Sequence, residues 1–167
     1  QHYAEFLKAA GEKPTDTRAD CKEDTTHRPF LGPKTCADNN TPLEPKFPNL
    51  AIGCIDWCDA RAFCEWAGKR LCEAASTGVT KGQPEKAGEW NLACSGGGKT
   101  MYPYGDTYEP GRCQDRTAGA PSDGMQTFQP GLKTECKGTA SPYDELRDMS
   151  GGMYEWAGPC HKSENGL

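Results

Sequence analysis

The sequence lacks an apolar run of about 18 residues, and it has no cluster of lysine and arginine. The first absence predicts no membrane-spanning segment in the given chain, and no signal peptide begins it. The second, with a net charge of −5, argues against binding to nucleic acid or to an acidic membrane surface. Histidine occurs only three times and no Cys-x-x-Cys pair exists, so a zinc site built from cysteine and histidine is not expected.

Cysteine, by contrast, is abundant, with ten residues in a chain of 167. So many cysteines without metal-ligand spacing are typical of disulfides formed in an oxidising compartment. We therefore expect an exported protein, extracellular or periplasmic. Two disulfides are hypothesised from proximity in the sequence: Cys21–Cys36 across a polar loop, and Cys113–Cys136 around a segment without periodicity.

Length and composition predict a single domain over residues 1–167. A chain of this size buries roughly 68–70% of its unfolded surface. Its 20 glycines and 13 prolines make up about a fifth of the residues, which favours long loops over regular structure. The patterns alone therefore indicate an irregular, loop-rich α+β fold tied by disulfides.

The clearest predicted element is a helix within residues 54–72. Asp56 is the expected N-cap, Asp59 adds negative charge to the first turn, and Gly68 is expected to end the helix in a left-handed conformation. One face carries small and aromatic residues at helical spacing while charged residues point away. The face consists of Ala60, Phe63, Cys64 and Ala67, and the residues pointing away are Arg61 and Glu65.

Three shorter elements are also predicted. Tyr3, Phe6 and Leu7 form one face of a helix closed by Gly11. A further helix is expected to begin near Pro84, to place Ala87, Trp90 and Cys94 on one face, and to stop at the glycines of 96–98. Residues 102–106 read as a short aromatic strand running into a turn.

Four segments follow one another in the order of a known family. They read DWCDARAFCEWAGKRL (residues 56–71), EWNLACSGGG (89–98), YPYGD (102–106) and LRDMSGGMYEW (146–156). These segments resemble the signatures of the formylglycine-generating enzyme family, also called the sulfatase-modifying factor family. The resemblance covers residues 54–160 well and the first 50 residues loosely, through QHYAEFL.

The resemblance implies an irregular α+β fold related to C-type lectins, with two helices packed on small twisted sheets. It also implies that residues 1–167 are the central part of a family domain that lacks its first and last strands. Either a companion polypeptide then completes the domain, or this protein closes its core differently. Cysteines with expected partners outside the chain are Cys64, Cys94 and Cys160.

The last segment carries a candidate metal site. Asp148 and Glu155 lie on either side of two glycines, and a tight turn there would direct hard oxygen donors at one point, which suits calcium. The resemblance implies a structural calcium site that uses these two side chains and the carbonyls of Gly151 and Met153. Alternatively, Asp148 caps a turn and Glu155 is solvated or paired with arginine. A second, weaker calcium site would involve Gln114 and Asp123.

Two functions are compatible with these features. In the first, the chain is an extracytoplasmic, calcium-stabilised domain with a binding or structural role and an unknown protein or glycan ligand. In the second, which the resemblance implies, it belongs to a copper-dependent oxidase that converts a cysteine in sulfatases to formylglycine. The catalytic cysteine pair and the copper would then lie downstream of residue 167. A sugar-binding module is a third possibility, by analogy with lectins alone.

Most of the large aromatic side chains are expected in the core and not on a ligand-binding surface. These residues are Trp57, Trp66, Trp90, Tyr102, Tyr104 and Trp156.

Overall fold

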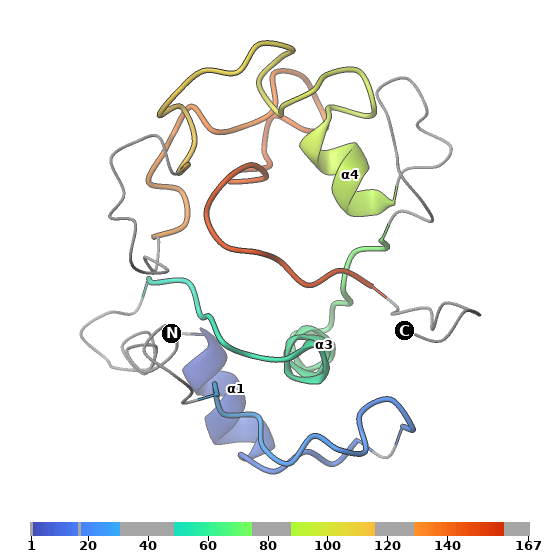
Figure 1. Ribbon diagram of the computed structural model, residues 1–167. Helices are drawn as coiled ribbons and strands as arrows, with labels where there is room; N and C mark the ends of the chain where they lie inside the picture. Colours follow the sequence, from blue (N-terminus) through green and yellow to red (C-terminus); the bar gives the residue numbers. More distant parts are fainter. Residues whose placement is uncertain (1, 17, 31–48, 75–87, 116–128, 159–167) are drawn as a thin grey trace.

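The computed structural model describes residues 2–16, 18–30, 49–74, 88–115 and 129–158 (Figure 1). Within these ranges three helices are joined by long irregular segments: α1 (His2–Ala10), α3 (Trp57–Trp66) and α4 (Glu89–Cys94). The described ranges contain no strand, and their bridges are isolated residue pairs. The twisted sheets expected from the resemblance are therefore not seen there, and the C-type-lectin-like architecture stays a prediction.

Helices α1 and α3 pack together through aromatic rings (Figure 1). Tyr3 and Phe6 of α1 are buried, as predicted. The ring of Phe63 in α3 lies 5.4 Å from the ring of Tyr3 and 5.8 Å from that of Phe6. Gly11 follows the last turn of α1 with φ 81°. Burial of each aromatic side chain contributes about 1.5–3 kcal/mol, so this contact accounts for the position of α1.

Both ends of α3 are determined by local hydrogen bonds. The Asp56 side chain accepts from the backbone N–H of Asp59 (2.8 Å), and the Asp59 side chain accepts from the N–H of Asp56 (3.2 Å), which forms a capping box. At the other end, Gly68 (φ 69°) donates to Glu65, and Lys69 donates to Cys64. These two bonds form a Schellman motif, so Asp56 and Gly68 have the predicted roles.

The exposed faces of α3 differ from the prediction. Arg61 was expected to point away, but it is only 8% exposed. Its guanidinium pairs with Asp16 and lies 5.2 Å from the ring centroid of Trp57. The polar segment after α1 thus supplies a counter-charge that allows the arginine to be buried. Ala67, expected on the buried face, is exposed, whereas Glu65 is exposed as predicted.

Helix α4 is shorter than predicted. It begins at Glu89, because the N-cap Gly88 has an extended conformation (φ −69°, ψ 167°), so a start near Pro84 is wrong. Residues 75–87, including Pro84 and Ala87, lie outside the described residues. The helix ends before three glycines with positive φ, as predicted.

Residues 102–106 form a turn and not a strand. Tyr102 and Gly105 make an isolated antiparallel bridge, and the rings of Tyr102 and Tyr104 stack with centroids 5.4 Å apart. Tyr104 packs with Cys113 and Cys136 in a small buried cluster. The aromatic residues therefore stabilise a turn that covers a disulfide.

The disulfides agree with one hypothesis and contradict the other. Cys113 is bonded to Cys136, as expected. Cys21 is bonded to Cys58, so the Cys21–Cys36 pairing is wrong. The loop of residues 18–30 folds back onto α3, which brings Cys21 next to the helix.

The last described segment runs beside α3 and crosses the chain that leaves its C-terminal end (Figure 1). The indole N–H of Trp57 donates to the carbonyl of Ala157, and the indole N–H of Trp156 donates to the carbonyl of Ile55, each at 2.9 Å. The first and last family-like segments are thus joined in space.

The prediction of buried aromatics holds for Tyr104 (7% exposed) but not for Trp66 (42%) or Trp156 (49%).

None of the helices in the described ranges has the length and apolar character needed to cross a membrane.

Candidate functional site

The turn that carries the predicted calcium ligands is held by backbone contacts. Asp148 has a left-handed conformation (φ 57°), and its N–H donates to the carbonyl of Cys136 (2.9 Å). Gly151 forms a parallel bridge with Gln114, and the N–H of Gly152 donates to the Gln114 carbonyl (2.7 Å). A Cβ on Gly151 would meet that carbonyl oxygen at 2.4 Å, so only glycine allows this approach.

Only one of the two oxygens of the Asp148 carboxylate has a hydrogen-bond partner among the described residues. Its Oδ2 accepts from the N–H of Gly131 at 2.5 Å. Its Oδ1 is buried and has no hydrogen-bond partner among the described residues. A buried carboxylate oxygen without a partner is unfavourable, and a cation or a water molecule would relieve the cost. The site therefore has the spare hard donor that calcium needs.

Glu155 and Met153 complete the predicted set on the same segment. Glu155 is exposed, and its Oε2 accepts from the indole N–H of Trp90 in α4 at 2.6 Å. Met153 is half-buried. The two carboxylates are thus positioned by different neighbours, Gly131 for Asp148 and α4 for Glu155.

Of the weaker second site, only Gln114 can be placed, because Asp123 lies outside the described residues. Gln114 is 8% exposed, and its Nε2 donates to the carbonyl of Gln129 (3.2 Å). Its Oε1 is buried and without a partner in the described part of the chain. Gln114 also forms the bridge to Gly151, so an unsatisfied side-chain oxygen occurs on each of the two paired segments.

Three of the described cysteines carry free thiols: Cys64, Cys72 and Cys94. Burial raises the pKa of Cys64, and the neighbouring Cys72 adds to the effect. Burial also raises the pKa of Cys94, whose Sγ donates to the carbonyl of Met149 (3.0 Å). Thiolates are therefore disfavoured at Cys64 and Cys94. Their pairing with cysteines outside the chain stays a prediction, and Cys160 lies outside the described residues.

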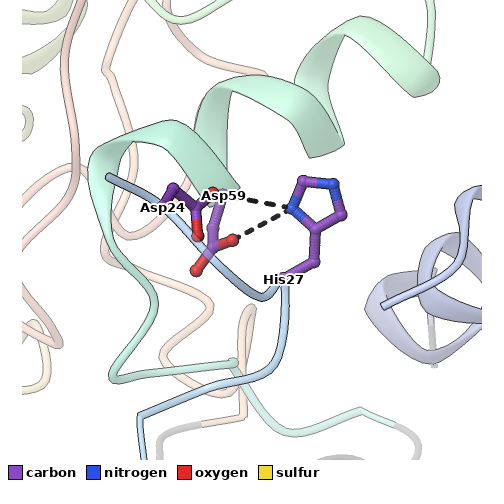
Figure 2. Close-up of side chains that lie close together, drawn as sticks. All are labelled: Asp24, His27 and Asp59. Carbon is purple, nitrogen blue, oxygen red and sulfur yellow. Dashed lines mark hydrogen bonds and ion pairs between the residues drawn. The ribbon is translucent and has the colours of Figure 1, made fainter. Parts of the chain in front are cut away.

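A second cluster of metal-ligand side chains lies between the 18–30 loop and α3 (Figure 2). His27 Nδ1 is 3.1 Å from Asp59 Oδ1 and 4.0 Å from Asp24 Oδ2. Burial raises the pKa of Asp59 to about 6, the hydrogen bond with His27 opposes this shift, and the nearby Asp56 and Asp24 add to it. Sequence reasoning missed this site, because it treated Asp59 only as a helix-cap charge and considered histidine only as a partner of cysteine in a zinc site. The Asp-x-x-His spacing of residues 24–27 was the available signal.

Comparison with known proteins identifies the family. A model of the sulfatase-modifying factor enzyme 1-like domain matches residues 1–166. The chain belongs to this family. The four segments that resemble the family signatures are all included in the matched range.

Part of the chain is similar in sequence to a curated relative. The chain is 39% identical over 59 residues to the inactive Cα-formylglycine-generating enzyme 2 of Bos taurus. The match covers 35% of this chain and 15% of the relative, so the chain spans only a small part of that protein's length. No solved structure matches the chain.

Proposed function

We propose that this chain is an exported, calcium-stabilised domain of the sulfatase-modifying factor family with a binding or structural role. The observation that carries the calcium proposal is the Asp148 carboxylate, since Oδ2 is fixed by Gly131 while Oδ1 is buried without a partner in the described ranges. Asp148 and Glu155 would supply side-chain oxygens, and Gly151 and Met153 would supply carbonyls. Calcium would then hold the turn against the Gln114 segment.

The non-catalytic role is supported by the relative, whose name describes it as inactive.

A binding role is supported by a pocket beside the Cys113–Cys136 disulfide. Its volume is about 450 Å³, within the range of small-molecule sites. Its lining combines acidic and basic side chains, among them Glu109, Arg112, Lys133 and Glu135. Arg112 is held by Glu109 at 2.8 Å and lies 4.7 Å from the Tyr104 ring centroid. Such a lining suits a polar ligand, in line with a glycan or a protein side chain.

Calcium titration of the chelator-treated chain tests the metal proposal. We expect calcium to bind with one-to-one stoichiometry and to raise the melting temperature. Asp148→Ala should abolish both effects, whereas Glu145→Ala, which removes an exposed carboxylate three residues away, should preserve them. If calcium neither binds to nor stabilises the unaltered chain, the calcium proposal is wrong.

The alternative function, a copper-dependent oxidase completed by a companion polypeptide, needs a separate test. Intact mass of the native material is measured before and after reduction. A single species of this chain's mass, shifted by ten hydrogens on reduction, supports the binding or structural role. Release of a second polypeptide that carries two cysteines, followed by copper-dependent conversion of a peptide cysteine to formylglycine, would overturn it.

A further inference from the structure

The cluster of Asp24, His27 and Asp59 is enclosed by the protein. Their side chains are 5%, 7% and 3% exposed, respectively, and one ligand atom from each lies within 4.8 Å of the others. The ring of Phe6 in α1 covers the imidazole at 5.0 Å. A buried group that carries two carboxylates requires compensation by positive charge.

His27 can satisfy only one of the two carboxylates in the cluster. A protonated Nδ1 of His27 can donate only one hydrogen bond. Asp59 Oδ1, the nearer carboxylate oxygen, accepts it. Asp24 Oδ2, at 4.0 Å, is too distant for a hydrogen bond and has no partner in the described ranges. One buried carboxylate oxygen therefore points into the cluster unsatisfied.

The three residues are held in place by their other atoms. Asp24 Oδ1 accepts from the N–H of Thr26 (3.0 Å), and Asp59 Oδ2 accepts from the N–H of Asp56 (3.2 Å). The backbone of His27 is also fixed at both polar groups. Its N–H donates to the carbonyl of Glu12, and its carbonyl accepts from the hydroxyl of Tyr3, each at 2.7 Å. Such supporting bonds orient the ligands of metal sites.

We propose that Asp24, His27 and Asp59 form a binding site for a divalent transition-metal ion of the zinc type. One imidazole nitrogen and two carboxylate oxygens are ligands that zinc accepts, whereas calcium prefers oxygen alone. Two carboxylates and a neutral imidazole balance the charge of a divalent cation. No cysteine takes part, so the absence of Cys-x-x-Cys pairs does not weigh against this site.

The spacing of the ligand atoms fits one ion. Two ligands of a tetrahedral zinc ion lie roughly 3.3–3.6 Å apart, so the observed separations of 3.1 and 4.0 Å bracket the required value. The widest pair of ligand atoms, at most 4.8 Å apart, must close by up to roughly 1.5 Å. A solvent molecule would complete the four-coordinate shell.

The test is titration of the full chain with zinc, and with cobalt as a spectroscopic substitute. Free thiols are first alkylated, and calcium is kept in excess so that the calcium site proposed at the Asp148 turn is occupied. We expect one zinc ion per chain and a cobalt spectrum typical of tetrahedral nitrogen and oxygen ligands. Asp24→Asn, which keeps the size of the side chain, should weaken binding by at least the roughly 10–100-fold that loss of a supporting group costs.

Glu23→Gln is the matched control, because Glu23 is in the same loop but its side chain is 90% exposed. The control should bind zinc as the unaltered chain does. Equal zinc binding by the Asp24→Asn and Glu23→Gln variants would overturn the proposal, as would failure of the unaltered chain to bind zinc. Circular dichroism of Asp24→Asn at the same concentration establishes that any loss of binding occurs in a folded protein.

Discussion

The Cys21–Cys58 disulfide fastens the loop of residues 18–30 to the first turn of α3, with Cα atoms 5.7 Å apart. Cys58 directly precedes Asp59, and Cys21 lies three residues before Asp24. The covalent bond therefore fixes two elements that each contribute a carboxylate to the buried cluster. The same disulfide therefore both stabilises the packing of the loop on α3 and helps to set the geometry of the cluster.

Removal of this disulfide by the double substitution Cys21→Ser and Cys58→Ser should destabilise the protein strongly. The bond joins residues 37 positions apart, which corresponds to roughly 4 kcal/mol in the chain-entropy treatment. Urea unfolding of the variant and of the unaltered chain measures the difference. An unchanged unfolding midpoint would show that the loop is held without the covalent bond.

The capping box of α3 should be sensitive to loss of the Asp56 side chain. Asp56→Ala removes the acceptor for the N–H of Asp59 and should cost about 1 kcal/mol. Asp56→Asn keeps an acceptor at the same place and serves as the control, since asparagine is also a good N-cap. Urea unfolding of both variants checks this, and equal losses would argue against capping as the cause.

The ion pair between Arg70 and Glu89 predicts a pH dependence. Two hydrogen bonds of 2.5 Å from Arg70 hold the pKa of Glu89 at about 2, below its ordinary value of 4.5. Because the pKa is lower in the folded state, the contribution of Glu89 to stability is present above pH 4.5 and is lost as the pH falls toward 2. Arg70→Gln should therefore flatten the melting temperature profile over this range.

The effect of Arg70→Gln should be small and should weaken with added salt, because both side chains are exposed. Melting temperatures at low and high salt provide the control. Parallel pH profiles for the variant and the unaltered chain would contradict the role assigned to this pair.

Gly151 should tolerate substitution less well than a glycine in open space. Gly151→Ala places a Cβ 2.4 Å from the Gln114 carbonyl oxygen, in addition to the cost of a left-handed conformation (φ 77°). Gly68→Ala carries only the conformational cost of about 1–2 kcal/mol, since no atom lies within 4 Å of its Cβ (φ 69°). Urea unfolding should show the larger loss for Gly151→Ala, and equal losses would mean that the Gln114 contact relaxes freely.

The features predicted correctly from the sequence depend on interactions between residues close in the chain. Asp56 and Asp59 are three residues apart, Gly68 directly follows the C-cap, and Tyr3 and Phe6 share one helical face. Cys113 and Cys136 are only 23 positions apart, with few competing cysteines nearby. Family membership was also predicted correctly, because four segments in the family's order identify it without knowledge of the fold.

The features that were missed depend on the path of an irregular loop. Residues 18–30 show no periodicity, so no sequence pattern places Cys21 beside Cys58 or Asp24 beside Asp59. Arg61 illustrates the same limit, because its burial requires Asp16 from another segment as a counter-charge.

By itself, the sequence determined the helix caps, the aromatic face of α1, the family and the segment that carries the proposed calcium ligands. Only the tertiary structure decided which distant residues meet: Cys21 with Cys58, and Asp24 with His27 and Asp59. The physical reason is that caps and helical faces are set by hydrogen bonds and spacing within a few residues. Contacts between loops are set instead by the burial and charge compensation of the whole molecule.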